Sequence, residues 1–366
     1  MDPLDDQPLA ETPVAPQRST MQQIFFGPYG LRAGWGLLIF IAMIVLTIMA
    51  VRTSFHLYYQ HHPAALAASK AAANAQKSAQ AAGSTEMPPR DAIFSHGIPF
   101  VLILLLSWIM SRIERRRIGV YGIPPKPYIA DFIKGLISGV CALSLLVGLL
   151  WISHLLVFTG FAITGRAAFI SALELLGAFT LVGFAEEYAF RGYLQYTIAR
   201  GLSGILPPGN PYRNALGFWL AATFLSIIFF VGHGKNPGES PIGLLSVFLV
   251  GLVFSYSLWR TGSLWWAIGM HITWDWAQSC IYGVADSGMM AKGHLLQSHP
   301  MGSPLLSGGL TGPEGSLFIL FILALLTLVI RFTLPKRPQP TLFPERAPVL
   351  PPPPVFIDAL PVAEAS

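Results

Sequence analysis

Residues 132–158 have the sequence FIKGLISGVCALSLLVGLLWISHLLVF, and this stretch decides the fold class. Lys134 is its only Lys, Arg, Asp or Glu residue. A helix that crosses a lipid bilayer needs about 20 mostly apolar residues. The stretch therefore predicts a membrane-spanning helix.

Seven other segments have the same character: 33–51, 93–110, 169–194, 214–232, 241–259, 264–282 and 317–334. The whole chain is 53% apolar and 11% charged, whereas soluble domains carry about 25% charged residues. Helices this apolar could also be buried in a soluble protein, but that protein would need one very large core. We predict an all-α, polytopic transmembrane bundle of about eight spans.

The distribution of Lys and Arg predicts the orientation, because these residues gather on the cytoplasmic side of membrane proteins. With the N-terminus in the cytoplasm, 15 of them fall on the inner side and 7 on the outer side. We therefore expect a multi-pass integral protein of a bacterial inner membrane, with both termini cytoplasmic. The lipid bilayer is its expected partner, and the net charge of +5 does not indicate nucleic acid.

Three short motifs place ionisable residues within the predicted spans, where such residues are expensive and mark candidate functional sites. They are EEYAFR at 186–191, FFVGH at 229–233 and HITWD at 271–275. Because the three motifs lie on different helices, their side chains can meet only around a cavity inside the bundle.

Helical geometry separates the two carboxylates of the first motif. Glu187 and Arg191 are four residues apart and share a helix face, so they can pair. Glu186 points about 100° away and stays free for proton transfer. In the alternative interpretation, these are charged groups that reach water at a cytoplasmic helix end.

The two histidine motifs differ in strength. His271 and Asp275 are also four residues apart, and a carboxylate beside an imidazole fixes the orientation of the ring. A purely structural pair between two helices is the alternative. His233 alone is a weak signal, because one histidine at a span end is usually an interfacial hydrogen-bonding group.

Taken together, a glutamate and two histidines offer a general base and proton donors for activating water. Glu186, His233 and His271 also form a plausible ligand set for a divalent metal such as zinc. The residues alone leave both chemistries open.

The three motifs resemble those of the CPBP family of intramembrane proteases, which process CAAX proteins and bacteriocins and include the type II CAAX prenyl endopeptidase. The family pattern is Glu-Glu-x-x-x-Arg, then Phe-x-x-x-His, then His-x-x-x-Asn or Asp. Here it is matched by Glu186, Glu187 and Arg191, by Phe229 and His233, and by His271 and Asp275. The resemblance covers about residues 131–282.

The resemblance implies roles for these side chains in cleaving a peptide or protein substrate, which could be membrane-anchored. Glu186 and His233 would activate water, His271 and Asp275 would hold the oxyanion or orient the water, and Glu187 with Arg191 would brace the site. The family often has Asn at the last position. Asp275 instead brings a negative charge, which suits an oxyanion only if it is protonated or turned onto His271.

The resemblance also suggests a division of the chain, with the catalytic transmembrane core at 131–283. The remaining predicted parts are a cytoplasmic tail at 1–32, two helices with a long Ala-rich outer loop at 33–130, an outer loop and last helix at 284–334, and a Pro-rich disordered tail at 335–366.

Other functions are compatible with the same residues. The Glu/His cluster could carry protons or metal ions in a transporter, or the chain could be a non-catalytic immunity or binding member of the family. The rhomboid-like Gly201-Leu202-Ser203-Gly204 is discounted because a Pro-rich loop follows it, and no His-Glu-x-x-His motif occurs.

One geometric difficulty follows from these span limits. They place Glu186 and His271 in the inner half of the bilayer, whereas His233 lies near its outer face. The site can form only if the fifth helix begins deeper, tilts strongly or folds back.

Overall fold

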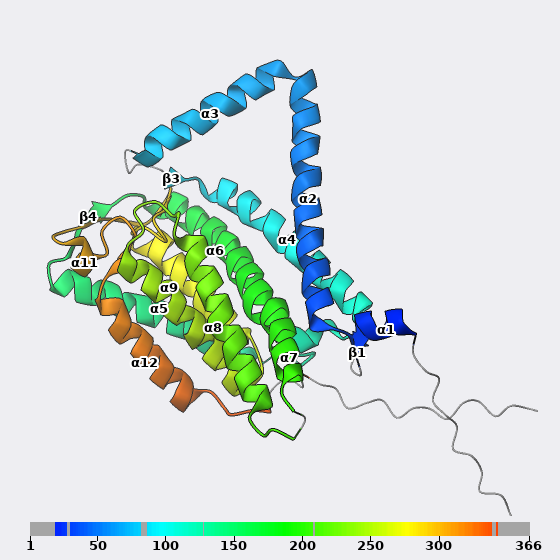
Figure 1. Cartoon of the computed structure of the whole chain (residues 1–366). Helices are drawn as coiled ribbons and strands as arrows, with labels where there is room; N and C mark the ends of the chain where they lie inside the picture. Colours follow the sequence, from blue (N-terminus) through cyan, green and yellow to red (C-terminus); the bar gives the residue numbers. More distant parts are fainter. Residues whose placement is uncertain are drawn as a thin grey trace, which may run out of the picture.

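The chain forms a bundle of helices (Figure 1), and this computed structural model confirms the predicted all-α, membrane-type fold class. The structure describes residues 19–338 except 28–29, 82–85, 127 and 208, and also Leu342; side chains of residues 75–81 are outside the description. Most of the predicted tails at 1–32 and 335–366 therefore lies outside the described residues.

The helices are α1 (Thr20–Phe25), α2 (Ala33–His61), α3 (Pro63–Ala81), α4 (Pro89–Ile113), α5 (Ile129–Ile152), α6 (Gly165–Glu187), α7 (Gln195–Ile205), α8 (Arg213–His233), α9 (Pro241–Thr261), α10 (Trp265–Trp276), α11 (Pro304–Ser307) and α12 (Phe318–Thr333). Shorter helical turns are η1 (Ile118–Tyr121), η2 (Tyr188–Leu194), η3 (Ala277–Ile281) and η4 (Pro313–Gly315). The strands are β1 (Phe26–Gly27), β2 (Gly30–Leu31), β3 (Glu86–Met87), β4 (Leu156–Phe161), β5 (Met290–Ala291) and β6 (Leu296–Pro300). They pair as β1–β2 and β4–β6, both antiparallel, and as β3–β5, which is parallel.

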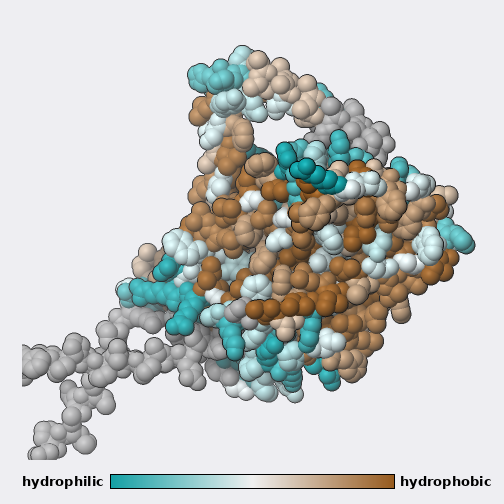
Figure 2. Space-filling view, turned by 180° about the vertical axis from the view of Figure 1, so that it is seen from behind, coloured by the Kyte–Doolittle hydropathy of each residue, from teal (hydrophilic) through white to brown (hydrophobic). Residues whose placement is uncertain are grey.

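Six helical segments in the described chain are long and apolar enough to cross a membrane: α2, α4, α5, the continuous segment from α6 through α7, α8 and α9. The last two predicted spans are also helical but shorter, so the number eight stays a prediction. Apolar side chains cover much of the surface of the body (Figure 2), and many large ones are exposed. This surface suits lipid contact, and the chain is an integral membrane protein.

Three predicted span limits were wrong. The span at 33–51 was too short, because α2 continues to His61. The span at 132–158 ends early, because α5 stops at Ile152 and residues 156–161 form strand β4, which pairs with β6. The span at 169–194 was too short, because the helix continues through η2 and α7 to Ile205. Apolar composition alone did not reveal these boundaries.

The extension of this helix removes the difficulty with His233. Segment α7 packs against α8, and only residues 206–212 join them. Glu186 and His233 each lie about 20 residues from that connection, or roughly 30 Å at 1.5 Å per residue. The two residues are therefore level with each other on neighbouring helices.

Close backbone contact fixes α10, which carries the third motif, against α5. A Cβ atom on Gly139 would collide with the Met270 carbonyl and the Thr273 hydroxyl, so only glycine permits this approach. Thr273 Oγ1 donates a hydrogen bond to the Leu136 carbonyl at 2.7 Å. Helix α10 is therefore held in the interior of the bundle.

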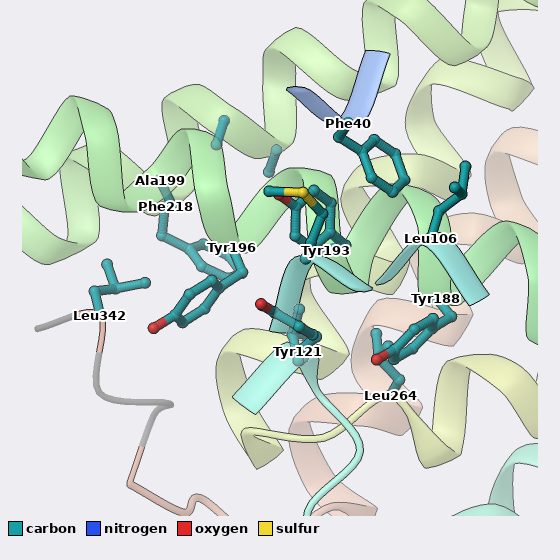
Figure 3. Close-up of a cluster of buried hydrophobic side chains, with 14 of the residues drawn as sticks. Phe40, Leu106, Tyr121, Tyr188, Tyr193, Tyr196, Ala199, Phe218, Leu264 and Leu342 are labelled. Atoms are coloured by element: carbon teal, nitrogen blue, oxygen red, sulfur yellow. The ribbon is translucent and has the colours of Figure 1, made fainter. Parts of the chain in front are cut away.

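The two ends of the bundle differ. We call residues 283–317, with β3 and β4, the cap; α3 returns the chain from the far end of α2 towards the cap (Figure 1). At the opposite end, a cluster of buried rings surrounds Tyr121, Tyr188, Tyr193 and Tyr196 (Figure 3).

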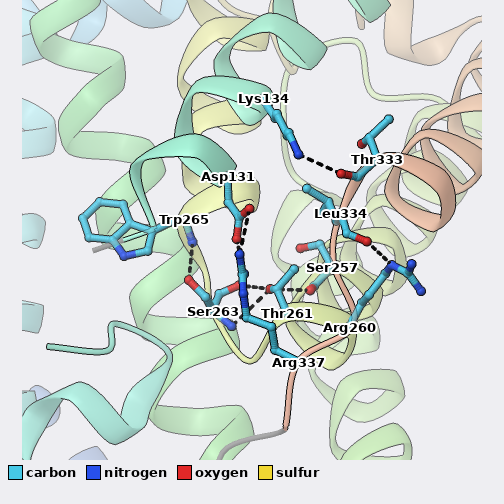
Figure 4. A network of polar contacts seen from close by, with 10 residues as sticks. All are labelled: Asp131, Lys134, Ser257, Arg260, Thr261, Ser263, Trp265, Thr333, Leu334 and Arg337. Atoms are coloured by element: carbon cyan, nitrogen blue, oxygen red, sulfur yellow. Dashed lines mark hydrogen bonds and ion pairs between the residues drawn. The ribbon is translucent and has the colours of Figure 1, made fainter. Parts of the chain in front are cut away.

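Polar contacts tie the chain after α12 back to this opposite end (Figure 4). Arg337 pairs with Asp131, Lys134 Nζ donates to the Thr333 carbonyl at 2.8 Å, and Arg260 Nε donates to the Leu334 carbonyl at 2.7 Å. Many Arg and Lys side chains lie here, so we call it the basic end.

Candidate active site

One cavity of about 320 Å³ lies in the cap half of the bundle, between α4, α6, α8, α9, α10 and the cap. Its polar or ionisable lining residues include Glu186, His233, His271 and Asp275, together with His96, Asn236, Asp286 and Glu314. The remaining lining is largely apolar. The three motifs thus meet around a single cavity.

The adjacent carboxylates at the end of α6 have different surroundings. The Glu187 side chain is fully buried, and its Oε1 accepts a hydrogen bond from Arg191 Nη1 at 3.0 Å. The Glu186 side chain is 36% exposed and lines the cavity. Glu187 is therefore bound within the protein, whereas Glu186 remains accessible to a molecule in the cavity.

Arg191 links the first two motifs. Its guanidinium lies 4.8 Å from the centre of the Phe229 ring and 5.6 Å from that of Phe254. A buried cation over aromatic faces gains electrostatic stabilisation. Arg191 therefore holds Glu187 on one side and the helix that carries His233 on the other.

His233 is the last residue of α8, and it lines the cavity. Nδ1 lies 2.8 Å from the Phe229 carbonyl oxygen. Because a carbonyl can only accept, Nδ1 must carry the hydrogen in this contact. In the neutral ring, Nε2 is then the basic nitrogen.

His271 lies between three carboxylates. Its Nδ1 is 3.0 Å from Glu187 Oε1, and its Nε2 is 3.3 Å from Asp275 Oδ2 and 3.9 Å from Glu186 Oε2. Asp275 is thus turned onto His271, which is one of the two arrangements open to a carboxylate at this position. The carboxylates on both sides fix the plane of the ring.

Wide helical turns directly follow two of the motifs. The turn η2 begins one residue after Glu187, and η3 begins two residues after Asp275; both are π-helical. Such turns are rare and occur frequently at functional sites, because they change the direction of side chains along a helix. Neither turn was evident from the sequence pattern.

Three ionisable residues of the cavity were not among the predicted site residues: His96, Asp286 and Glu314. His96 interrupts an apolar span, which is itself a signal of function. Asp286 and Glu314 lie in the cap, where no periodic pattern distinguishes them from ordinary loop carboxylates.

The two cap carboxyls have strongly altered acidity. Burial raises the pKa of Glu314 to about 8. Burial also raises the pKa of Asp286 well above its ordinary value, and the nearby carboxylates of Asp275 and Glu314 raise it further. Perturbed groups that share a cavity are typical of catalytic sites.

Both histidines of the predicted zinc site already have other contacts in this structure. No group of three His, Cys, Asp or Glu side chains within the described part of the chain is arranged to hold a metal ion. In the conformation seen, His271 Nδ1 contacts Glu187 and His233 Nδ1 contacts a carbonyl. Zinc at Glu186, His233 and His271 stays a prediction.

Comparison with known proteins identifies the segment that contains all three motifs. Residues 168–277 match the family model of type II CAAX prenyl endopeptidase Rce1-like proteins. The chain carries an Rce1-like domain. No curated protein and no solved structure matches the chain.

The Rce1-like domain runs from the start of α6 into η3 and contains Glu186, His233, His271 and Asp275. The match supports membership of the CAAX protease group, and so a hydrolase embedded in the membrane. His96, Asp286 and Glu314 lie outside the matched residues, although they line the same cavity.

Proposed function

We propose that the protein is an intramembrane endopeptidase in which Glu186 and His233 activate a water molecule. The observation that carries this proposal is the meeting of Glu186, His233, His271 and Asp275 around one cavity. A general base needs an accessible acceptor, and Glu186 is the carboxylate of its motif that faces the cavity.

The proposed reaction begins when Glu186 removes a proton from water and the oxygen attacks the substrate carbonyl carbon. His233 Nε2 orients that water or shares its proton. In the proposed step, the N–H at His271 Nε2, which lies 3.3 Å from Asp275 Oδ2 in this conformation, is donated to the developing negative charge. The apolar lining excludes bulk water, which strengthens these electrostatic interactions.

The expected substrate is a peptide or protein at the membrane, and the position of the cavity indicates the side from which it comes. Arg and Lys residues concentrate at the basic end. They include Arg112, Arg115, Arg116, Arg117, Lys126, Arg200, Arg213, Arg260, Arg331, Lys336 and Arg337. The cavity lies in the opposite, cap half. By the distribution of positive charge, the basic end and both termini are cytoplasmic, and the cap faces outward from a bacterial inner membrane.

A cleavage assay with the purified protein in liposomes tests the proposal. Its substrates are a library of lipid-anchored fluorogenic peptides, including a prenylated one. Glu186→Gln should lower kcat at least about 10³-fold, because it removes the general base. The matched control is Glu174→Gln, which changes a carboxylate on the same helix that pairs with Arg90 outside the cavity. Its activity should stay near wild type.

Full activity of Glu186→Gln would contradict the proposal. Proton or metal-ion flux into the same liposomes, lost in His271→Ala and accompanied by no cleavage, would favour a transporter instead. Loss of cleavage with a chelator, and its return with zinc, would add a metal to the mechanism.

A further inference from the structure

A tight turn of the cap directs Asp286 into the cavity. The Asp286 N–H donates to the Met289 carbonyl at 2.8 Å, and the Met289 N–H donates to the Asp286 carbonyl at 2.9 Å. Between them, Ser287 has a φ of 48° and Gly288 a φ of 80°. A non-glycine residue in the left-handed region is uncommon and indicates that the surroundings impose the conformation.

Two buried side chains, Glu314 and Gln278, hold the turn in this conformation. Glu314 Oε1 accepts a hydrogen bond from the Ser287 N–H at 2.6 Å. Its Oε2 accepts from Gln278 Nε2, which also donates to the Ala285 carbonyl at 2.6 Å. The turn is therefore bound to η3, which follows the third motif, and to η4 at the start of the last helix.

The Asp286 carboxyl itself remains available to the cavity. It lines the cavity, and within the described part of the chain it makes no hydrogen bond with the protein. The ionisable groups that act on it are Asp275, Glu314, His271 and Glu186, and His96 and His233 also line the cavity.

This surrounding favours the neutral acid. Burial and the nearby carboxylates of Asp275 and Glu314 raise the pKa of Asp286, while His271 opposes the change. A carboxyl whose pKa is raised holds its proton more readily, and it can deliver that proton to a leaving group.

We propose that Asp286 is the general acid of the peptidase, donating a proton to the amide nitrogen as the peptide bond breaks. The inference rests on the proposed function, in which Glu186 is the general base. When water attacks, the new C–O bond forms, the carbonyl electrons move to oxygen, and Glu186 takes the proton.

When the intermediate collapses, the C–N bond breaks and nitrogen takes the proton of Asp286. The proton on Glu186 then returns to Asp286 through cavity water. One water is consumed, and a carboxylic acid and an amine are released.

The test compares an amide with an activated ester of the same acyl group, because the phenolate that leaves an activated ester needs no proton. Asp286→Asn should lower kcat on the amide about 10²-fold or more, with KM and ester turnover close to wild type. In the wild type, amide turnover should fall at alkaline pH, and the residual amide turnover of Asp286→Asn should no longer show this fall. Glu314→Gln, which alters a positioning residue, should lower amide turnover less and spare the ester.

The outcomes separate this proposal from the proposed function. Equal amide turnover in Asp286→Asn and wild type, or an equal loss on amide and ester with an unchanged thermal midpoint, would overturn the role of Asp286. Glu186→Gln should lose turnover of both the amide and the ester, whatever the role of Asp286. If it keeps that turnover, the peptidase proposal itself fails. Because Asn is neutral and similar in shape, the Asp286 variant should fold.

Discussion

Neighbouring residues of identical type have different surroundings in this protein. Glu187 is fully buried with Arg191 and His271, while Glu186 beside it opens on the cavity. Two successive positions on a helix face directions about 100° apart, so one glutamate can organise the site while the other meets the substrate. This division predicts separable effects of the two carboxylates on stability and turnover.

The buried Glu314 predicts a pH dependence of stability. Its pKa is raised to about 8 in the folded protein from an ordinary value of 4.5. The folded state therefore binds its proton more tightly than the unfolded state, and the free energy of unfolding should fall as the pH rises from about 4.5 to about 8. Thermal unfolding in detergent across this range should show the slope.

Glu314→Gln should make that slope shallower, although Asp286, whose pKa is also raised, contributes in the same direction. Glu86→Gln changes an exposed carboxylate of β3 and should leave the slope as it is. An identical slope in wild type and Glu314→Gln would show that Glu314 does not carry the effect.

Among the individual site residues, the sequence revealed those that belong to short motifs and missed those that do not. Glu186, His233 and His271 were found because ionisable groups are rare in apolar spans. Asp286 and Glu314 lie in the cap, where charged residues are common. Only the tertiary fold shows that their side chains turn inward.

Among the elements, the pair α5 and α10 determines where the third motif lies. The helices approach so closely at Gly139 that the next smallest side chain would overlap α10. The position of His271 therefore depends on the absence of a side chain on another helix.

Gly139→Ala should destabilise the protein by about 1–3 kcal/mol, the usual cost of overpacking, and should also lower turnover by displacing α10. Gly148 lies on the same helix, and a Cβ there meets no atom within 4 Å. Gly148→Ala should cause no loss, because alanine favours a helix by about 1 kcal/mol over glycine. Thermal midpoints in detergent compare the two; equal effects would show that close packing at Gly139 is unimportant.

Element types were readable from apolar runs, but element ends were not. Residues 156–158 are as apolar as the helix before them, yet they pair with β6. Residues 195–205 are more polar than a typical span, yet they continue the helix. The first boundary is set by a strand partner about 140 residues away, and the second by packing against α8. Local composition carries no information about either contact.

For the whole molecule, the proposed orientation predicts which end of the bundle a reagent outside the cell can reach. In a background of Cys141→Ala and Cys280→Ala, a membrane-impermeant thiol reagent should label Ser303→Cys in the cap on intact cells. Pro335→Cys, just after α12 at the basic end, should react only after the membrane is permeabilised. Both positions are exposed in the structure, and the reverse pattern would place the cavity on the cytoplasmic side.

The continuous helix from Gly165 to Ile205 has 41 residues, or about 60 Å at 1.5 Å per residue. The hydrocarbon layer of a bilayer is only about 30 Å thick. This rod must therefore lean or protrude, and the lipid beside it must adapt its thickness. Because Glu186 lies near the middle of the rod, the acyl-chain length of the host membrane becomes a variable that acts directly on the depth of the carboxylate.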